Sequence, residues 1–302
     1  MTFIYSYNNK HIKKICNFKI IKKLDNKWHS SNHPSKVFLS KLNNRYIIIK
    51  KINLNKINKI LYYNPKVTDI YEYLYNNCDK HLIKHLFKIY YIYNCNHIQY
   101  NIIKYYKYNF SDYNNIILND YRNILSNLNI FLFYLNNKLH IYHNDLYVYA
   151  KPNTINLNNI MFYNTTLNYK LNYKLHDNIK VEYKISKYIP VLIDFDASDK
   201  EMIKRNDINN INKHMFQNKI KFESEIIFFN TCCIIKYLYN QSWLKSKKFN
   251  KNRVVSYVKN IILYIHDYIL SKNNINSKID FEAYFVKYIN KNFIKIVNRF
   301  NI

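Results

Sequence analysis

The chain contains no glycine among its 302 residues. Average usage of about 7% would supply roughly twenty glycines in a protein of this length. Glycine is the residue that adopts positive φ without steric cost, so tight turns here must be built from residues with less backbone freedom. Tyrosine, asparagine, isoleucine and lysine, which have AT-rich codons, fill the gap, and we interpret this first as a coding bias.

The length suits one large domain or two lobes with a substantial core. Forty-seven basic and nineteen acidic residues give a formal net charge of +28. Such an excess is typical of proteins that bind nucleic acid, anionic membranes or acidic partners. Lysine is nevertheless spread along the whole chain, so we interpret most of the charge as solvated surface that also attracts ATP or acidic partners. Nucleic-acid binding has only the net charge in its favour.

Cysteine usage and hydropathy indicate the compartment. The five cysteines form no C-x-x-C pair and leave an odd count, which argues against a zinc site or a disulfide framework. A reducing compartment is the simplest interpretation. The N-terminus has no apolar core of signal-peptide type, and no run reaches about 18 apolar residues. We therefore expect a soluble, intracellular, cytoplasmic protein without a membrane span.

The N-terminal third predicts a small β-sheet. Three short β-branched runs from Phe18 to Ile52, separated by polar turns, are typical of an antiparallel meander. A helix with an apolar face is expected over residues 64 to 75. Two more strands are expected over residues 85 to 108, with a turn near residues 94 to 96. Together these elements predict a five-stranded sheet with one helix.

The remaining two thirds of the chain are predicted to be mainly helical. Apolar residues recur at three- and four-residue spacing from Tyr121 to Leu139, which predicts an amphipathic helix. A strongly apolar helix is expected to begin near Glu225, and two amphipathic helices are expected over about 253 to 271 and 279 to 300. The tyrosine- and lysine-rich segment 163 to 188 is predicted to be a linker.

Three polar positions carry the chemistry. Asp145 follows a turn, Asn159 precedes a short apolar strand, and Asp194 ends another apolar strand. Carboxylate and amide oxygens on rigid supports are the ligands that Mg²⁺ prefers. A carboxylate near an acceptor hydroxyl, together with an asparagine and a second aspartate on magnesium ions, is an arrangement for phosphoryl transfer.

The motifs His143-Asn144-Asp145-Leu146, Asn159-Ile160-Met161 and Ile193-Asp194-Phe195-Asp196 resemble the catalytic and metal-binding motifs of the protein-kinase-like superfamily. In particular they resemble those of divergent Ser/Thr protein kinases of large AT-rich DNA viruses. The resemblance covers about residues 18 to 240. It implies an α+β, two-lobed fold: a leader (1–17), a small ATP-binding lobe of antiparallel β-sheet with one helix (18–105), and a larger, mainly helical catalytic lobe (106–302).

The resemblance also implies roles for single residues. Asp145 would be the base or orienting residue for the attacking hydroxyl. Lys50 would bind the α- and β-phosphates of ATP, and Glu72 would pair with Lys50 and hold it in place. Asn159 and Asp194 would hold Mg²⁺. Cofactors are thus expected to be ATP and Mg²⁺.

The nucleotide-binding part departs from the family pattern. Ser30, Asn32 and Ser35, ahead of Val37, stand where kinases have the glycines of the phosphate-covering loop. These residues lack the freedom of glycine at positive φ, so ATP binding is the function that this departure affects most. The segment from Lys104 to residue 109, with Tyr105, is the expected hinge, where the backbone would contact adenine.

The catalytic segment departs from the pattern as well. Fourteen residues separate Asp145 from Asn159, where kinases have five, and Asn158 and Asn153 are alternative metal ligands. Glu225, with Glu223 as an alternative, is expected to hold the catalytic loop.

We therefore predict an ATP-dependent protein kinase that phosphorylates Ser or Thr of a protein substrate, either acidic or of viral or host origin. Two alternatives stay open. The same motifs occur in small-molecule phosphotransferases for choline and aminoglycosides. The missing glycines and the interrupted loop favour a catalytically inactive kinase fold that serves as a basic binding module.

Overall fold

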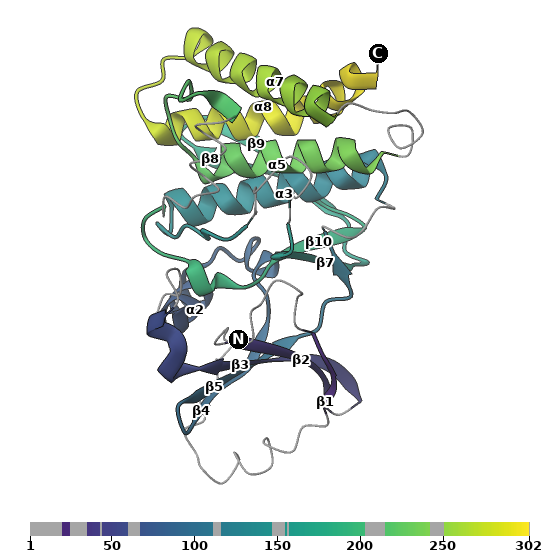
Figure 1. Cartoon of the computed structure of the whole chain (residues 1–302). Helices are drawn as coiled ribbons and strands as arrows, with labels where there is room; N and C mark the ends of the chain where they lie inside the picture. The colour runs from purple at the N-terminus through teal and green to yellow at the C-terminus, as the bar shows by residue number, and fades with distance from the viewer. Residues whose placement is uncertain are drawn as a thin grey trace. The chain divides into compact units, whose positions relative to one another are not determined.

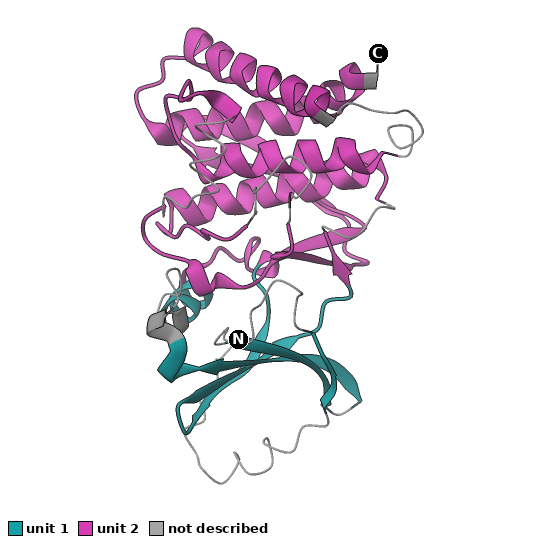
Figure 2. Ribbon diagram, viewed as in Figure 1, with its two compact units in different colours: residues 1–76, 86–107 teal, residues 77–85, 108–302 magenta. Residues whose placement is uncertain are grey.

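The computed structural model describes residues 20–24, 35–42, 44–59, 67–110, 116–146, 155, 157–202, 215–241 and 251–301. The chain forms two compact units (Figure 2): unit 1 comprises Met1–Asn76 and Leu86–Lys107, and unit 2 comprises Asn77–His85 and Tyr108–Ile302. The segment Asn77–His85 therefore belongs to unit 2, although the predicted small lobe ran without interruption to residue 105. The expected leader, 1–17, lies outside the described residues.

Unit 1 is built on a five-stranded antiparallel sheet in the order β1-β2-β3-β5-β4 (Figure 1). Its strands are β1 (Ile20–Lys23), β2 (Ser35–Leu42), β3 (Arg45–Asn53), β4 (Ile89–Cys95) and β5 (Ile98–Lys104). The predicted helix is α2 (Val67–Asn77). Ile47 and Ile49 of β3 pack with Tyr93 and Ile102 in a hydrophobic core on one face of the sheet. The predicted sheet and helix are confirmed.

Unit 2 is mainly helical. Its long helices are α3 (Leu118–Asn137), α5 (Glu225–Asn240), α7 (Lys251–Lys272) and α8 (Lys278–Asn298). Helix α3 packs against α5 and α8, and α7 packs against both of those helices. Helix α5 is buried on almost every side, as its continuous apolar sequence predicts. The α+β class, with a small antiparallel sheet and a larger helical part, is confirmed.

A short three-stranded antiparallel sheet in unit 2 supports the candidate site. Its strands are β6 (Tyr108–Asn109), β7 (Ile160–Asn164) and β10 (Tyr188–Leu192), in the order β10-β7-β6. Strand β7 begins directly after Asn159, and β10 ends two residues before Asp194. The strands predicted beside these two residues are therefore confirmed.

The prediction of a linker over residues 163 to 188 is wrong. The segment forms an antiparallel hairpin of β8 (Tyr169–His176) and β9 (Ile179–Ile185). Ile179, Val181, Tyr183 and Ile185 are buried, whereas the side chains between them are more exposed. Strand β9 packs against α3 and α8. The alternation of apolar and polar residues in β9 is readable in the sequence and predicts a half-buried strand.

Buried polar contacts attach the hairpin to the 77–85 segment. The imidazole of His85 lies with Nδ1 2.7 Å from the carbonyl oxygen of Pro190 and Nε2 2.6 Å from the hydroxyl of Tyr183. The same hydroxyl lies 2.8 Å from the carbonyl oxygen of His81. Burial lowers the pKa of His85 to about 4. The ring is therefore neutral at pH 7, Nδ1 donates to Pro190, and Nε2 is an acceptor. The Tyr183 hydroxyl has one proton, which it shares between Nε2 of His85 and the carbonyl oxygen of His81.

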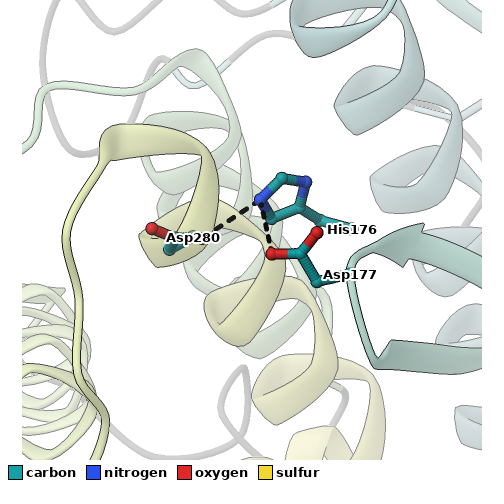
Figure 3. Close-up of side chains that lie close together, drawn as sticks. All are labelled: His176, Asp177 and Asp280. Carbon is teal, nitrogen blue, oxygen red and sulfur yellow. Dashed lines mark ion pairs between the residues drawn. The ribbon is translucent and has the colours of Figure 1, made fainter.

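The hairpin turn is attached to the start of α8 (Figure 3). Nε2 of His176 lies 3.1 Å from Oδ1 of Asp280 and 3.4 Å from Oδ2 of Asp177. Oδ2 of Asp280 accepts hydrogen bonds from the backbone N–H and hydroxyl of Ser277, and the Ser277 hydroxyl accepts from the N–H of Asp280. This capping box satisfies backbone groups at the helix N-terminus. Ion pairing and capping account for this cluster without a metal ion.

Across the described residues, no helix combines the length and the apolar character needed to cross a bilayer.

The Tyr183 hydroxyl provides a test of how firmly the hairpin is integrated. Tyr183→Phe leaves the buried His85 nitrogen and the His81 carbonyl without this partner, and we expect it to lower the free energy of unfolding by about 1–3 kcal/mol. Urea unfolding measures the effect. Tyr264→Phe removes the hydroxyl of a side chain that is 58% exposed, and we expect no change. Equal stabilities of the two variants would contradict this role of the hairpin.

Candidate active site

The segment from Leu139 to Leu146 follows α3 and carries Asp145. His140 and Asn144 have positive φ values of 53° and 61°. Asparagine and histidine are among the residues that tolerate this left-handed region best after glycine. The chain thus turns twice within a few residues, without glycine, and the half-buried Asp145 directly follows the second turn.

A buried carboxylate holds this loop. Glu225, at the start of α5, accepts hydrogen bonds from the backbone N–H groups of His143 (3.3 Å) and Asn144 (2.8 Å). With its amide oriented to satisfy both partners, Asn136 of α3 donates to Oε2 of Glu225 (3.2 Å) and to the carbonyl oxygen of Ile141 (3.0 Å). Glu225 therefore has the predicted position. Asn136 was not predicted, although a polar residue on the buried face of α3 is a signal that could have identified it.

Burial raises the pKa of Glu225 to about 7. The hydrogen bonds from Asn144, His143 and Asn136 act in the opposite direction because they stabilise the charged form, while nearby Glu282 raises the pKa further. Burial also raises the pKa of Glu282, which accepts from the Ser224 hydroxyl (2.5 Å) and the Asn137 amide (2.6 Å). These contacts connect the ends of α3 and α5 to α8.

His143 is fully buried and has a structural position. Its Nε2 lies 2.8 Å from the carbonyl oxygen of Ile193, and its ring centroid lies 4.4 Å from that of Phe195. The hydroxyl of Ser198 donates to the His143 carbonyl oxygen at 3.2 Å. His143 therefore connects the loop to the segment that carries Asp194.

Two further contacts connect the same segments. The backbones of Tyr142 and Asp199 form an antiparallel bridge with N–H to carbonyl distances of 2.8 and 3.1 Å. The amide of Asn144 donates to the carbonyl oxygen of Glu201 at 3.0 Å. The loop and residues 193–201 are thus held side by side by a backbone bridge and by a side-chain amide that binds the backbone.

Asn159 lies against Asp145. Its Nδ2 donates to the carbonyl oxygen of Asp145 at 2.6 Å and to Oδ2 of the same residue at 3.0 Å. Because Nδ2 makes both bonds, Oδ1 is the amide atom left to act as a metal ligand. The carbonyl oxygen of Asn159 accepts from the N–H of Ile193 at 2.9 Å, which brings the residue before Asp194 to the same place.

The neighbouring asparagines have other positions. The carbonyl oxygen of Asn158 accepts from the amide of Asn109 at 3.1 Å, a contact that sequence reasoning did not predict. Asn153 lies outside the described residues. Of the three candidate asparagines, Asn159 is therefore the one among the described residues whose side chain contacts Asp145.

Asp194 itself has a left-handed backbone, with φ 63° and ψ 62°. It lies between β10 and a short 3₁₀ helix, η3 (Phe195–Ala197), in which Phe195 is fully buried. A short polar side chain tolerates this conformation better than a branched one. The turn at Asp194 therefore buries the next residue while the carboxylate stays half-buried, accessible to a cation.

In unit 1, Lys50 is 6% exposed and lies opposite Asn101 of β5, so the two side chains share one face of the sheet. Lys51 points to the other face, over the ring of Tyr100 at 5.8 Å. Glu72 is exposed on α2 and forms no ion pair with another described residue. The structure therefore does not bring Lys50 and Glu72 together.

The remaining residues predicted to bind the nucleotide lie in unit 1. Ser35 begins β2, and Val37 lies opposite Lys50 in the β2–β3 register. Ser30 and Asn32 lie outside the described residues.

The expected hinge lies close to the unit boundary at Lys107. The N–H of Lys104 donates to the carbonyl oxygen of Lys88 at 2.9 Å, and its ammonium lies 5.5 Å from the centroid of the Tyr106 ring. Burial, and then the charge of Lys88, lowers the pKa of Lys104. Tyr105 packs against Tyr46 with ring centroids 5.9 Å apart.

The pKa of Glu225 predicts how stability depends on pH. An unfolded Glu carboxyl loses its proton near pH 4.5, whereas the folded Glu225 keeps it up to about pH 7. The contribution of this group is therefore fully present below pH 4.5 and is lost as the pH rises to 7, by about 3 kcal/mol. In Glu225→Gln we expect this part of the pH dependence to disappear from urea unfolding curves.

Glu223→Gln is the matched control, because it removes the same charge two residues away. We expect it to keep the fall in stability between pH 4.5 and 7. A Glu225→Gln profile parallel to that of the wild-type protein would contradict the assignment.

Comparison with known proteins adds little to this geometry. No family model matches the chain, and no curated protein matches it significantly. A crystal structure of a kinase domain is similar, with 15% sequence identity and a TM-score of 0.40. The similarity covers 73% of this chain and 62% of that kinase domain, so the chain spans less than two thirds of the structure that it matches. The argument for function therefore depends on the residues of the site.

Proposed function

We propose that this protein is an ATP- and Mg²⁺-dependent phosphotransferase, and specifically a protein kinase that acts on Ser or Thr. The observation that carries the proposal is the contact of Asn159 with Asp145, together with its backbone bond to Ile193 beside Asp194. The Asn159 amide contacts the Asp145 carboxylate, and its carbonyl oxygen binds the residue directly before Asp194.

The donor set fits magnesium. Oδ1 of Asn159 and the carboxylate of Asp194 are hard oxygen ligands, and Mg²⁺ typically takes one or two carboxylates and completes its shell with water and phosphate oxygens. Asn159 directly precedes β7, and Asp194 follows β10 by two residues. The three-stranded sheet therefore gives both residues rigid supports. When bound, the ion would supply positive charge to the phosphate oxygens of ATP.

Asp145 is the proposed base. The Asn159 amide donates to its Oδ2, which orients the carboxylate. An acceptor hydroxyl within hydrogen-bond distance of Asp145 would give its proton to the carboxylate as the oxygen attacks the terminal phosphate of ATP. Glu225 acts only through the backbone of the loop and is a positioning residue.

Lys50 is the proposed ligand of the α- and β-phosphates. It is largely buried on a β-strand, so its ammonium has a restricted range of positions. A second candidate function, an inactive kinase-like binding module, is favoured by one observation. Glu72, the expected partner of Lys50, is exposed and unpaired within the described residues.

Phosphate transfer from γ-labelled ATP tests the proposal and separates the candidates. The purified full chain would be incubated with Mg²⁺ and with basic proteins, acidic proteins or choline. We expect label on Ser or Thr of a protein, and a rate about 10²–10⁴ lower in Asp145→Asn, because the base is lost.

Asp177→Asn is the matched control, since it makes the same change at an exposed hairpin turn and should keep full activity. Label on choline alone would identify a small-molecule phosphotransferase. Absence of transfer to every acceptor would contradict the proposal and favour the binding module.

A further inference from the structure

Helix α3, strand β9 and helix α8 pack on one another in unit 2 (Figure 1). A cavity of about 240 Å³ is lined by residues of these three elements. It shares no residue with the candidate active site. Five cationic side chains line it: Arg122, Lys180, Lys184, Lys287 and Lys291. Residues of β9 form one wall of the cavity, which therefore depends on the hairpin of residues 169 to 185.

The charges of the cavity are unbalanced. Glu182 is the acidic residue that lines it, and its carboxylate pairs with Lys170 at 3.5 Å. None of the five cations forms an ion pair with a carboxylate of the described part of the chain. Like charges that line one partly enclosed space repel each other and attract a counter-anion.

One of the cations is oriented by the protein. Nε of Arg122 donates to the carbonyl oxygen of Asn290 at 3.1 Å. This bond holds the half-buried guanidinium and leaves its two terminal nitrogens available. A guanidinium with two available N–H groups matches the oxygens of a phosphate group in geometry as well as in charge.

Independent evidence for a ligand comes from Nδ2 of Asn290, a buried amide donor without a partner. Neighbouring hydrogen bonds establish which atom of this amide is Nδ2. Nδ2 of Asn230 donates to the carbonyl oxygen of Ile226, which can only accept, and also to Oδ1 of Asn129, both at 2.7 Å. Nδ2 of Asn129 therefore faces Oδ1 of Asn290, at 3.1 Å. These bonds fix the orientation of the Asn290 amide.

Because Oδ1 of Asn290 accepts from Asn129, the other atom of this amide is the donor Nδ2. Asn290 lines the cavity and is 8% exposed, and its Nδ2 is buried without a hydrogen-bond partner. Buried polar groups of native proteins are usually satisfied, so an unsatisfied donor requires an explanation. A donor beside five unpaired cations is suited to an anionic oxygen.

A second buried amide indicates what else the ligand carries. Asn127 is 1% exposed, and its Nδ2 donates to the carbonyl oxygen of Lys184 at 2.8 Å. Its Oδ1 is buried without a partner, and Asn127 is one of the residues that line the cavity. A carbonyl oxygen needs a donor, which a hydroxyl group supplies.

We propose that this cavity binds a phosphate-bearing small molecule that also has a hydroxyl group, as in phosphorylated polyols. Arg122, the lysines and Nδ2 of Asn290 would bind the phosphate oxygens, and Oδ1 of Asn127 would accept from the hydroxyl. Glu182 is directed to Lys170 and leaves the excess positive charge of the cavity in place.

Calorimetric titration of the full chain tests the proposal, with fructose 1,6-bisphosphate and inorganic phosphate as probes. Salt at about 0.15 M limits attraction to the generally basic surface. We expect saturable binding with one site per chain. Lys287→Ala/Lys291→Ala removes two exposed cations of the cavity and should weaken binding about tenfold or more.

Two variants make the result specific. Lys272→Ala/Lys295→Ala removes the same charge from exposed positions that do not line the cavity, and we expect less than about a twofold change. Asn290→Asp keeps an acceptor for Asn129 but replaces the free donor by a carboxylate, and should also weaken binding; circular dichroism would verify that it folds.

The two probes separate the possible ligands. Tighter binding of the bisphosphate supports a phosphorylated polyol, and equal binding of inorganic phosphate supports a site for phosphate itself; both outcomes support the phosphate chemistry. Absence of saturable binding, or equal weakening in both double-lysine variants, would overturn the proposal, because anions would then be attracted only by the general charge of the surface.

Discussion

The buried carboxylate of Glu225 is the interaction on which the candidate active site depends. It accepts hydrogen bonds from the backbone N–H groups of the two loop residues that directly precede Asp145. Removing a carboxylate from water is costly, as the raised pKa of Glu225 indicates. Three donors offset part of that cost, so the loop and the carboxylate stabilise each other. Because Glu225 begins the most buried helix, the position of the loop is determined by the packing of α3, α5 and α8.

The absence of glycine explains much of the local structure. The described residues with positive φ are asparagine, aspartate, histidine or glutamine. Asn44, Asn96 and Asp177 occupy this region in the turns of hairpins, and Asn144 and Asp194 occupy it in the candidate site. The short polar side chains of these residues reduce the penalty of the left-handed region. In Asp194 one residue therefore serves both as the turn and as the proposed metal ligand.

Periodic patterns predicted the helices and most strands, because these elements depend on local alternation of apolar and polar residues. The hairpin β8–β9 was missed because tyrosine and lysine dominate residues 163 to 188 and obscured the alternation at Ile179, Val181 and Tyr183. The order of the motifs identified Asp145, Asn159 and Asp194 as candidates. The chain between Asp145 and Asn159 includes residues outside the described part. A contact between two residues separated in this way is not predicted by a local pattern. Similarly, the exposure of Glu72 depends on the orientation of α2 within unit 1, which the apolar pattern of the helix does not determine.

Binding of a paramagnetic divalent cation tests the central claim most directly. Mn²⁺ shares the preference of Mg²⁺ for oxygen ligands, and electron paramagnetic resonance reports the free and bound ion. In the presence of ATP, we predict saturable Mn²⁺ binding by the full chain and a loss of affinity of about tenfold or more in Asp194→Asn. Asp177→Asn should bind as the wild-type protein does. Equal binding by all three proteins would contradict the account, because Asp194 would then not hold the metal ion.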